Sequence, residues 1–158
     1  MAKLELLVIH CTATRAGVNV QADDVRRWHT DPPPGGRGWR QVGYADLILL
    51  NGTIANLAPY DADDVVDPWE VTNGVRGINS RSRHVCYVGG LDATGQPADT
   101  RTNDQLWSLF LYVNINLRLH PGLKVAGHNQ FAPKACPSFD VPTWMRAAGY
   151  RDENIYTP

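Results

Sequence analysis

The segment from residue 128 to residue 140 concentrates side chains that bind metals or stabilise charge. His128 and Cys136 lie eight positions apart, and Lys134 lies between them. Imidazole nitrogen and thiolate sulfur are common zinc ligands, and catalytic zinc sites usually take three protein ligands and leave one position for water. His10 is the best candidate for the third ligand, because it directly follows an apolar run. The simpler alternative is that these residues are ordinary polar or packed side chains.

Two further residues could assist such a metal. A metal-bound water that attacks a carbonyl creates an oxyanion, and the ammonium group of Lys134 would stabilise that charge. The phenol of Tyr44 could donate a hydrogen bond to the water or to the oxyanion. The alternatives are a solvated lysine and a core tyrosine. Cys11 and Cys86 are predicted to be packed thiols, since neighbouring strand residues point to opposite faces and Cys11 would face away from His10.

Composition narrows the function classes. The 158 residues fit one domain, and 43% apolar with 20% charged residues is typical of a soluble globular protein. Fifteen basic and 16 acidic residues give a net charge of −1, which disfavours a nucleic-acid-binding surface. No apolar run approaches the roughly 20 residues that span a bilayer. Three cysteines disfavour a disulfide framework, and no export signal is visible, so we expect cytoplasmic synthesis.

Apolar runs and turn signals predict the elements that must position these groups. Residues 4–9 form a nearly continuous apolar run, typical of a buried strand, with His10 at its end. Asn51-Gly52 predicts a hairpin turn. Further strands are predicted at 44–50, 53–57, 85–88 and 124–126, helices at 20–29, 102–119 and 140–149, and a long irregular segment with a solvated acidic run at 58–83.

Strands and helices alternate along the chain, with one hairpin inserted. This order predicts a single α/β domain, with a central mixed β-sheet and helices packed on its faces. The metal site should lie at the C-terminal edge of the central strands, where ligands gather in such sheets. We expect residues 1–150 to form the catalytic domain and residues 151–158 to form a polar C-terminal tail.

Several motifs, in order, resemble one enzyme family from about residue 7 to residue 144. The chain is similar to the zinc-dependent N-acetylmuramoyl-L-alanine amidases of the phage-lysozyme and peptidoglycan-recognition-protein type. The matching segments are His10-Cys11-Thr12-Ala13-Thr14, Val25-Arg26-Arg27-Trp28-His29, Trp39 through Gly43-Tyr44, Asn51-Gly52-Thr53, Gly77-Ile78-Asn79, residues 85–90, Gly127-His128 and residues 132–140.

The resemblance implies a function and a set of roles. His10, His128 and Cys136 would bind zinc, while Tyr44 and Lys134 would assist catalysis. The substrate would be the amide between N-acetylmuramic acid and L-alanine in bacterial peptidoglycan, and zinc would lower the pKa of its bound water to about 7. We expect a monomeric phage or prophage endolysin that acts on the cell wall after release and binds no membrane.

The sequence departs from the family pattern at two positions, and three alternative functions are considered. Ala45 and Gly74 stand where the family usually has histidines, which leaves the substrate side of the site less defined than the zinc side. The alternatives are a non-catalytic peptidoglycan-binding module, an antibacterial amidase effector, or an inhibitory partner of a polymerase. Such binding modules typically lose a zinc ligand, most often the cysteine, whereas all three candidates are present here.

Overall fold

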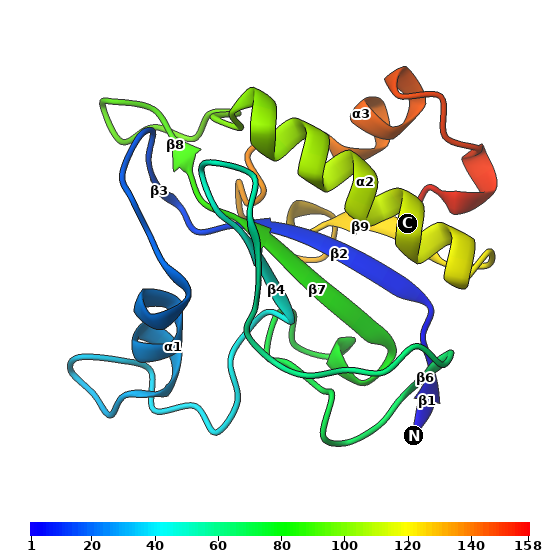
Figure 1. The fold of residues 1–158 in the computed structure, drawn as a ribbon, viewed down its shortest axis with the longest axis horizontal. Coiled ribbons are helices and arrows are strands. Elements are labelled where there is room, and N and C mark those ends of the chain that lie inside the picture. Colours follow the sequence, from blue (N-terminus) through cyan, green and yellow to red (C-terminus); the bar gives the residue numbers. More distant parts are fainter.

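A computed structural model describes residues 1–158, with a five-stranded mixed sheet at the centre (Figure 1). The strand order is β5-β4-β7-β2-β9, and only β4 and β5 pair antiparallel. The strands are β2 (Leu6–Cys11), β4 (Asp46–Ile48), β5 (Ile54–Asn56), β7 (Ser82–Tyr87) and β9 (Lys124–Gly127). The expected α/β domain with a central mixed sheet is confirmed.

Strand β2 is buried on both faces, which explains its unbroken apolar sequence. All six of its residues are buried, and it lies between β7 and β9, parallel to both. Parallel strands covered on both faces need apolar side chains in both directions. His10 is the exception within β2, and its side chain is fully buried.

Helices cover both faces of the sheet: α1 (Ala22–Thr30), α2 (Asn103–Leu119) and α3 (Val141–Ala147). Helices α2 and α3 pack against one face of β2, and the shared core cluster includes Leu7 and Ile9 of that strand. Val25 of α1 belongs to a second cluster with Leu47 and Cys86. Two of the predicted helices begin at residues that act as N-caps, because Thr102 forms a capping box with Gln105, and Asp140 accepts from the Thr143 amide.

Two small sheets flank the centre. Strand β1 (Ala2–Lys3) pairs antiparallel with β6 (Val65–Val66), and β3 (Thr14–Arg15) pairs parallel with β8 (Gly90–Leu91). The expected irregular segment at 58–83 therefore contains β6, together with the short 3-10 helix η1 (Asn79–Arg81). None of the helices combines the length and the apolar character that crossing a bilayer requires.

The hairpin at Asn51-Gly52 is confirmed, but its turn is not the two-residue type in which both residues take a positive φ. Only Gly52 has a positive φ, of 82°, and its amide donates to the Leu49 carbonyl. A turn closed by a left-handed glycine fits a loop longer than two residues. A Cβ at Gly52 would lie 2.8 Å from the carbonyl oxygen of Asp104 in α2, so the glycine also permits close packing against that helix.

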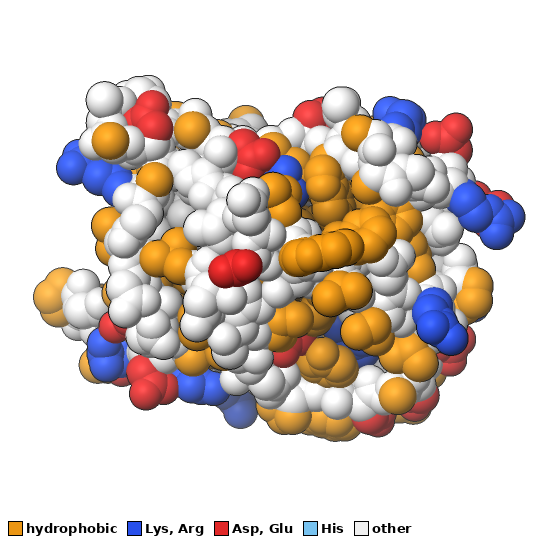
Figure 2. Space-filling view, turned by 45° about the horizontal axis from the view of Figure 1, so that its top comes forward, with side chains coloured by type: hydrophobic (Ala, Val, Ile, Leu, Met, Phe, Trp, Pro, Cys, Tyr) orange, Lys and Arg blue, Asp and Glu red, His pale blue; other side chains and the backbone are white.

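Helix α2 turns polar side chains inward and several apolar side chains outward. Leu109 and Val113 are buried as expected, together with the polar residues Gln105, Tyr112 and Asn116. Gln105 donates to the Val88 carbonyl, which explains its burial. Figure 2 shows apolar side chains gathered on one face of the molecule, and four exposed apolar residues recur along α2 at intervals of four: Trp107, Leu111, Ile115 and Leu119.

The polar tail expected at residues 151–158 is instead partly packed against the sheet. It contains the short 3-10 helix η3 (Asp152–Asn154), and Ile155 is only 1% exposed. The Tyr156 amide donates to the Val125 carbonyl, which ties the segment to the edge strand β9. Composition alone hides the effect of one apolar residue placed beside an uncovered strand.

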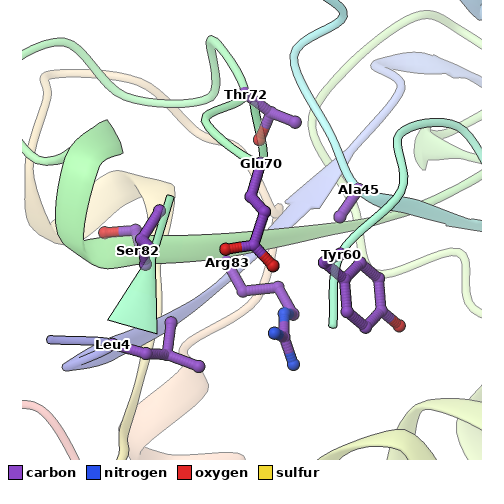
Figure 3. A pocket seen from close by; sticks show the side chains of 8 residues that line it. Leu4, Ala45, Tyr60, Glu70, Thr72, Ser82 and Arg83 are labelled. Atoms are coloured by element: carbon purple, nitrogen blue, oxygen red, sulfur yellow. The ribbon is translucent and has the colours of Figure 1, made fainter. Parts of the chain in front are cut away.

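A buried polar network fixes β4 to α2 and to the long loop. Asp46 is 3% exposed and accepts hydrogen bonds from the hydroxyls of Tyr60 and Tyr112 and from the Asn56 amide. Figure 3 shows the neighbouring cavity, which Tyr60 and Arg83 line together with Glu70. Its volume is about 10 Å³, so it holds no more than a water molecule.

We expect Asp46→Ala to lower the free energy of unfolding by about 3 kcal/mol, because it leaves buried donors without an acceptor. Urea unfolding measures the change. Asp23→Ala is the matched control, since Asp23 makes an exposed ion pair with Arg26 and its loss should cost no more than about 1 kcal/mol. Equal stability losses in the two variants would contradict a structural role for the Asp46 network.

Candidate metal and catalytic site

Three predicted ligands converge at the C-terminal edge of β2 and β9. The Nδ1 atoms of His10 and His128 lie 3.1 Å apart, and Cys136 Sγ lies 3.8 Å from His10 Nδ1. All three ligand atoms lie within 4.8 Å of one another. The structure therefore brings together residues that are 118 and 126 positions apart in the chain.

The two separations that involve His10 fit one tetrahedral metal ion. Zinc bonds to nitrogen of about 2.0–2.1 Å and to sulfur of about 2.3 Å place two nitrogens about 3.3 Å apart and a nitrogen and sulfur about 3.6 Å apart. The observed 3.1 Å and 3.8 Å lie close to both values. Two imidazoles and a thiol form a donor set that suits zinc and leaves a fourth position open.

Local structure fixes each of the three groups. His10 is the fifth residue of β2, and His128 begins the 3-10 helix η2 (His128–Gln130) directly after β9. The loop that carries Cys136 is held by the Tyr87 hydroxyl, which donates to the Pro137 carbonyl at 2.7 Å. The Cys11 amide donates to Cys136 Sγ at 3.3 Å. Cys136 Sγ thus accepts a backbone hydrogen bond, which would also stabilise its thiolate form.

The protonation states of these groups also suit a metal. Burial, followed by the neighbouring His84 and His128, lowers the pKa of His10 well below its usual value. Burial and then Lys134 lower the pKa of His128. Both imidazoles are therefore neutral at pH 7, with a lone pair available. The hydrogen bond with Cys11, together with burial, raises the pKa of the Cys136 thiol, so metal binding must displace its proton.

Tyr44 lies against the candidate ligand His10. Its ring centroid is 5.0 Å from that of His10 and 5.2 Å from that of His29. His29 belongs to α1 and accepts from the Gly43 amide, so α1 helps to place the tyrosine. Burial raises the pKa of Tyr44 well above its usual value, and the phenol therefore keeps its proton as a hydrogen-bond donor.

An open groove of about 530 Å³ begins at His128. Lys134 is exposed on its wall, together with two more cations, Arg37 and Arg76. Trp39 also lines the groove and stacks on His29, with ring centroids 5.0 Å apart. A groove with three cations and an aromatic wall can hold an extended anionic ligand beside the metal site.

The other sequence expectations have mixed outcomes. Cys11 and Cys86 are buried thiols, as predicted. Asp46, which follows Ala45 in the chain, belongs to the structural network described above and not to the metal site. His84 was missed: it lies in β7, and its Nδ1 is 3.0 Å from His10 Nε2. Nothing in the sequence around His84 marks it, since it directly precedes the strand expected at 85–88, lies far from His10 in the chain, and is part of β7 only because that strand begins at Ser82.

Comparisons with known proteins give both sequence relatives and structural neighbours. No protein-family model matches the chain. The chain is 36% identical over 138 residues to an endolysin of Enterobacteria phage K11 and 37% identical over 139 residues to an endolysin of Klebsiella phage KP32. Each match covers 87% of this chain and 83% of the relative.

Two solved structures share the fold. The N-acetylmuramoyl-L-alanine amidase LysC from Clostridium intestinale URNW superposes with a TM-score of 0.72 and 18% identity, covering 95% of this chain and 88% of that one. PGRP-SA of Apis mellifera gives a TM-score of 0.71 with 17% identity, covering 100% and 88%. At such identities, these similarities show a common fold.

We expect the metal-free protein to lose stability as the pH falls from about 6.5. Burial and then Arg37 lower the pKa of His29 to about 4, and burial lowers that of His84 to about 3. Below pH 6.5 the unfolded chain therefore binds protons that the folded chain does not, and protonation favours unfolding. Urea unfolding of EDTA-treated protein at several pH values measures this dependence.

His29→Asn is the control, because its amide oxygen can still accept from the Gly43 amide while one titrating group is removed. The slope of stability against pH should be shallower in this variant. Unchanged stability of the native sequence between pH 7 and about pH 4.5 would contradict neutral buried histidines.

Proposed function

Since this chain belongs to the endolysin family, whose fold is that of the N-acetylmuramoyl-L-alanine amidases and peptidoglycan recognition proteins, we propose that it is such an amidase. It hydrolyses the amide between N-acetylmuramic acid and L-alanine in bacterial peptidoglycan. The observation that carries this proposal is the convergence of His10, His128 and Cys136 beside a groove. These three residues hold a zinc ion.

The residues around the metal ligands have different roles in hydrolysis. A bound zinc ion supplies Lewis-acid chemistry and a nucleophile at neutral pH. Lys134 donates a hydrogen bond to the amide oxygen as negative charge develops on it. Tyr44, whose ring lies 5.0 Å from that of His10, keeps its proton at neutral pH and donates a second hydrogen bond. These donors stabilise the transition state more than the neutral substrate.

The groove binds the stem peptide. Peptide stems of the cell wall carry carboxylates, and Arg37 and Arg76 place two cations along the groove that begins at His128. Guanidinium groups form paired hydrogen bonds with carboxylates, which fixes both the position and the direction of the peptide. The amide next to the sugar would then lie near the metal ligands.

The same proposal covers where the protein acts and with what it associates. It is made in the cytoplasm and reaches the wall after release, as a monomeric endolysin of a phage or prophage. Its net charge of −1 gives no general attraction to nucleic acid. Residues 1–150 form the catalytic domain, and the packed segment at 151–158 completes it. A non-catalytic binding module is less favoured, because all three ligand groups are present and converge.

We expect the purified protein to release stem peptides with a new L-alanine amino terminus from peptidoglycan. Mass spectrometry of the digest identifies the bond that is cut. New reducing sugar ends would show glycosidase activity and would exclude the proposed reaction. Cys136→Ser is the matched control, because it changes one ligand atom, and it should bind zinc more weakly and release no stem peptide. Full hydrolysis by metal-free protein would exclude the role of zinc.

We expect Lys134→Gln to lower kcat by roughly 10²–10³-fold, as the loss of one donor to a developing oxyanion does in other hydrolases. Zinc content should stay at the native level, because Lys134 is not one of the proposed ligands. Steady-state kinetics on a soluble muropeptide measure the effect. Lys124→Gln is the control, since Lys124 is also exposed but lies at the opposite end of β9. A native kcat in Lys134→Gln would remove this lysine from the mechanism.

A further inference from the structure

A third imidazole lies behind the metal ligands. His84 is fully buried in β7, and its Nδ1 lies 3.0 Å from Nε2 of His10. Its ring centroid is 5.1 Å from that of His10. The other ring nitrogen of His84 has no hydrogen-bond partner among the protein atoms. The single polar contact of this buried ring is therefore with a proposed metal ligand.

The chain leaves room for this ring at Gly74. A Cβ built on Gly74 would lie 2.3 Å from Nδ1 and 2.4 Å from Cγ of His84. Such distances are far below van der Waals contact, so any side chain at position 74 would displace the imidazole. Position 74 is also one of the two places where the sequence resemblance led us to expect a histidine. Here the imidazole comes from the neighbouring strand and fills the space that the glycine leaves.

The metal-binding geometry determines which histidine donates in the hydrogen bond between His10 and His84. His10 approaches the other two ligands through Nδ1, so Nδ1 must carry the lone pair and Nε2 must carry the proton. That proton needs a buried acceptor, and His84 Nδ1 lies within hydrogen-bond distance. Hydrogen bonds of this kind fix the tautomer and ring orientation of metal-binding histidines and increase their basicity.

We propose that His84 is a positioning residue for the metal ligand His10, and that Gly74 is required because it leaves space for the His84 ring. The inference rests on the proposed metal site. It adds a role for two residues that lie outside the ligand set and outside the pair of groups assigned to catalysis.

Two substitutions at position 84 separate positioning from packing. His84→Leu fills much of the space but has no acceptor. His84→Asn keeps an acceptor oxygen at the same number of bonds from Cβ as the native Nδ1. Zinc affinity, measured by competition with a chromogenic chelator, should fall about 10–100-fold in His84→Leu and recover to within about threefold of the native value in His84→Asn.

The absorption spectrum of the cobalt-substituted protein gives a readout that is independent of hydrolysis. The ligand-field bands report the geometry around the metal, so they should shift in His84→Leu and stay close to native in His84→Asn. His120→Leu is the matched control, because His120 is 6% exposed and both its ring nitrogens lack protein partners. Its zinc affinity should match that of the native protein. Thermal unfolding confirms that each variant is folded.

The second half of the proposal is tested at the glycine. Gly74→Ala should weaken zinc binding about tenfold or more, because its methyl group displaces His84. Gly122→Ala is the control, since a Cβ there meets no atom within 4 Å.

Native zinc affinity in His84→Leu, or equal losses in His84→Leu and His84→Asn, would overturn the positioning role. Native affinity in Gly74→Ala would overturn the requirement for space. A native protein that binds no zinc would instead refute the proposed function.

Discussion

The proposed active site depends on the parallel hydrogen bonding of β2 to both of its neighbours. Because β7 and β9 run in the same direction as β2, all three strands end at one edge of the sheet. This arrangement places His10 and His128 at that edge. The Cys136 loop is held to the same edge by Tyr87 at the end of β7. The α-helices and the small sheets hold this edge in place but supply none of the three ligand atoms.

The same arrangement creates an energetic problem that the site itself resolves. His10 and His84 are fully removed from water, and buried polar atoms without partners are costly. Each histidine relieves part of that cost for the next, because Nδ1 of His128 faces Nδ1 of His10 and Nε2 of His10 faces His84. A metal ion would replace the contact between His10 and His128 by accepting the lone pairs of both Nδ1 atoms, and the contact between His10 and His84 would be kept. The row of rings is therefore held by electrostatic pairing, while the surrounding apolar side chains exclude water.

Sequence patterns predict the parts of this structure that depend on local signals. The apolar run before His10, the Thr102 cap and the Asn51-Gly52 hairpin are local, and all three are present. Contacts between distant segments leave no such signal. The role of His84 can be recognised only from its distance to His10 and from the missing side chain at Gly74. Likewise, the packing of Ile155 depends on an open strand edge, and the inward polar face of α2 depends on what lies beneath it.

The wide separation of the ligands in the chain affects when the site can first exist. His10 and Cys136 are 126 positions apart, and the segment around Ile155 closes the edge of β9 after both. Chains emerge from the ribosome beginning at the amino terminus, and contacts between distant residues form late in folding. A nascent chain therefore carries an inert first half, and the proposed ligand set is complete only after Cys136 has been made and has folded against β2. A fragment released by premature termination would lack a ligand and pose no danger to the wall of the cell that made it.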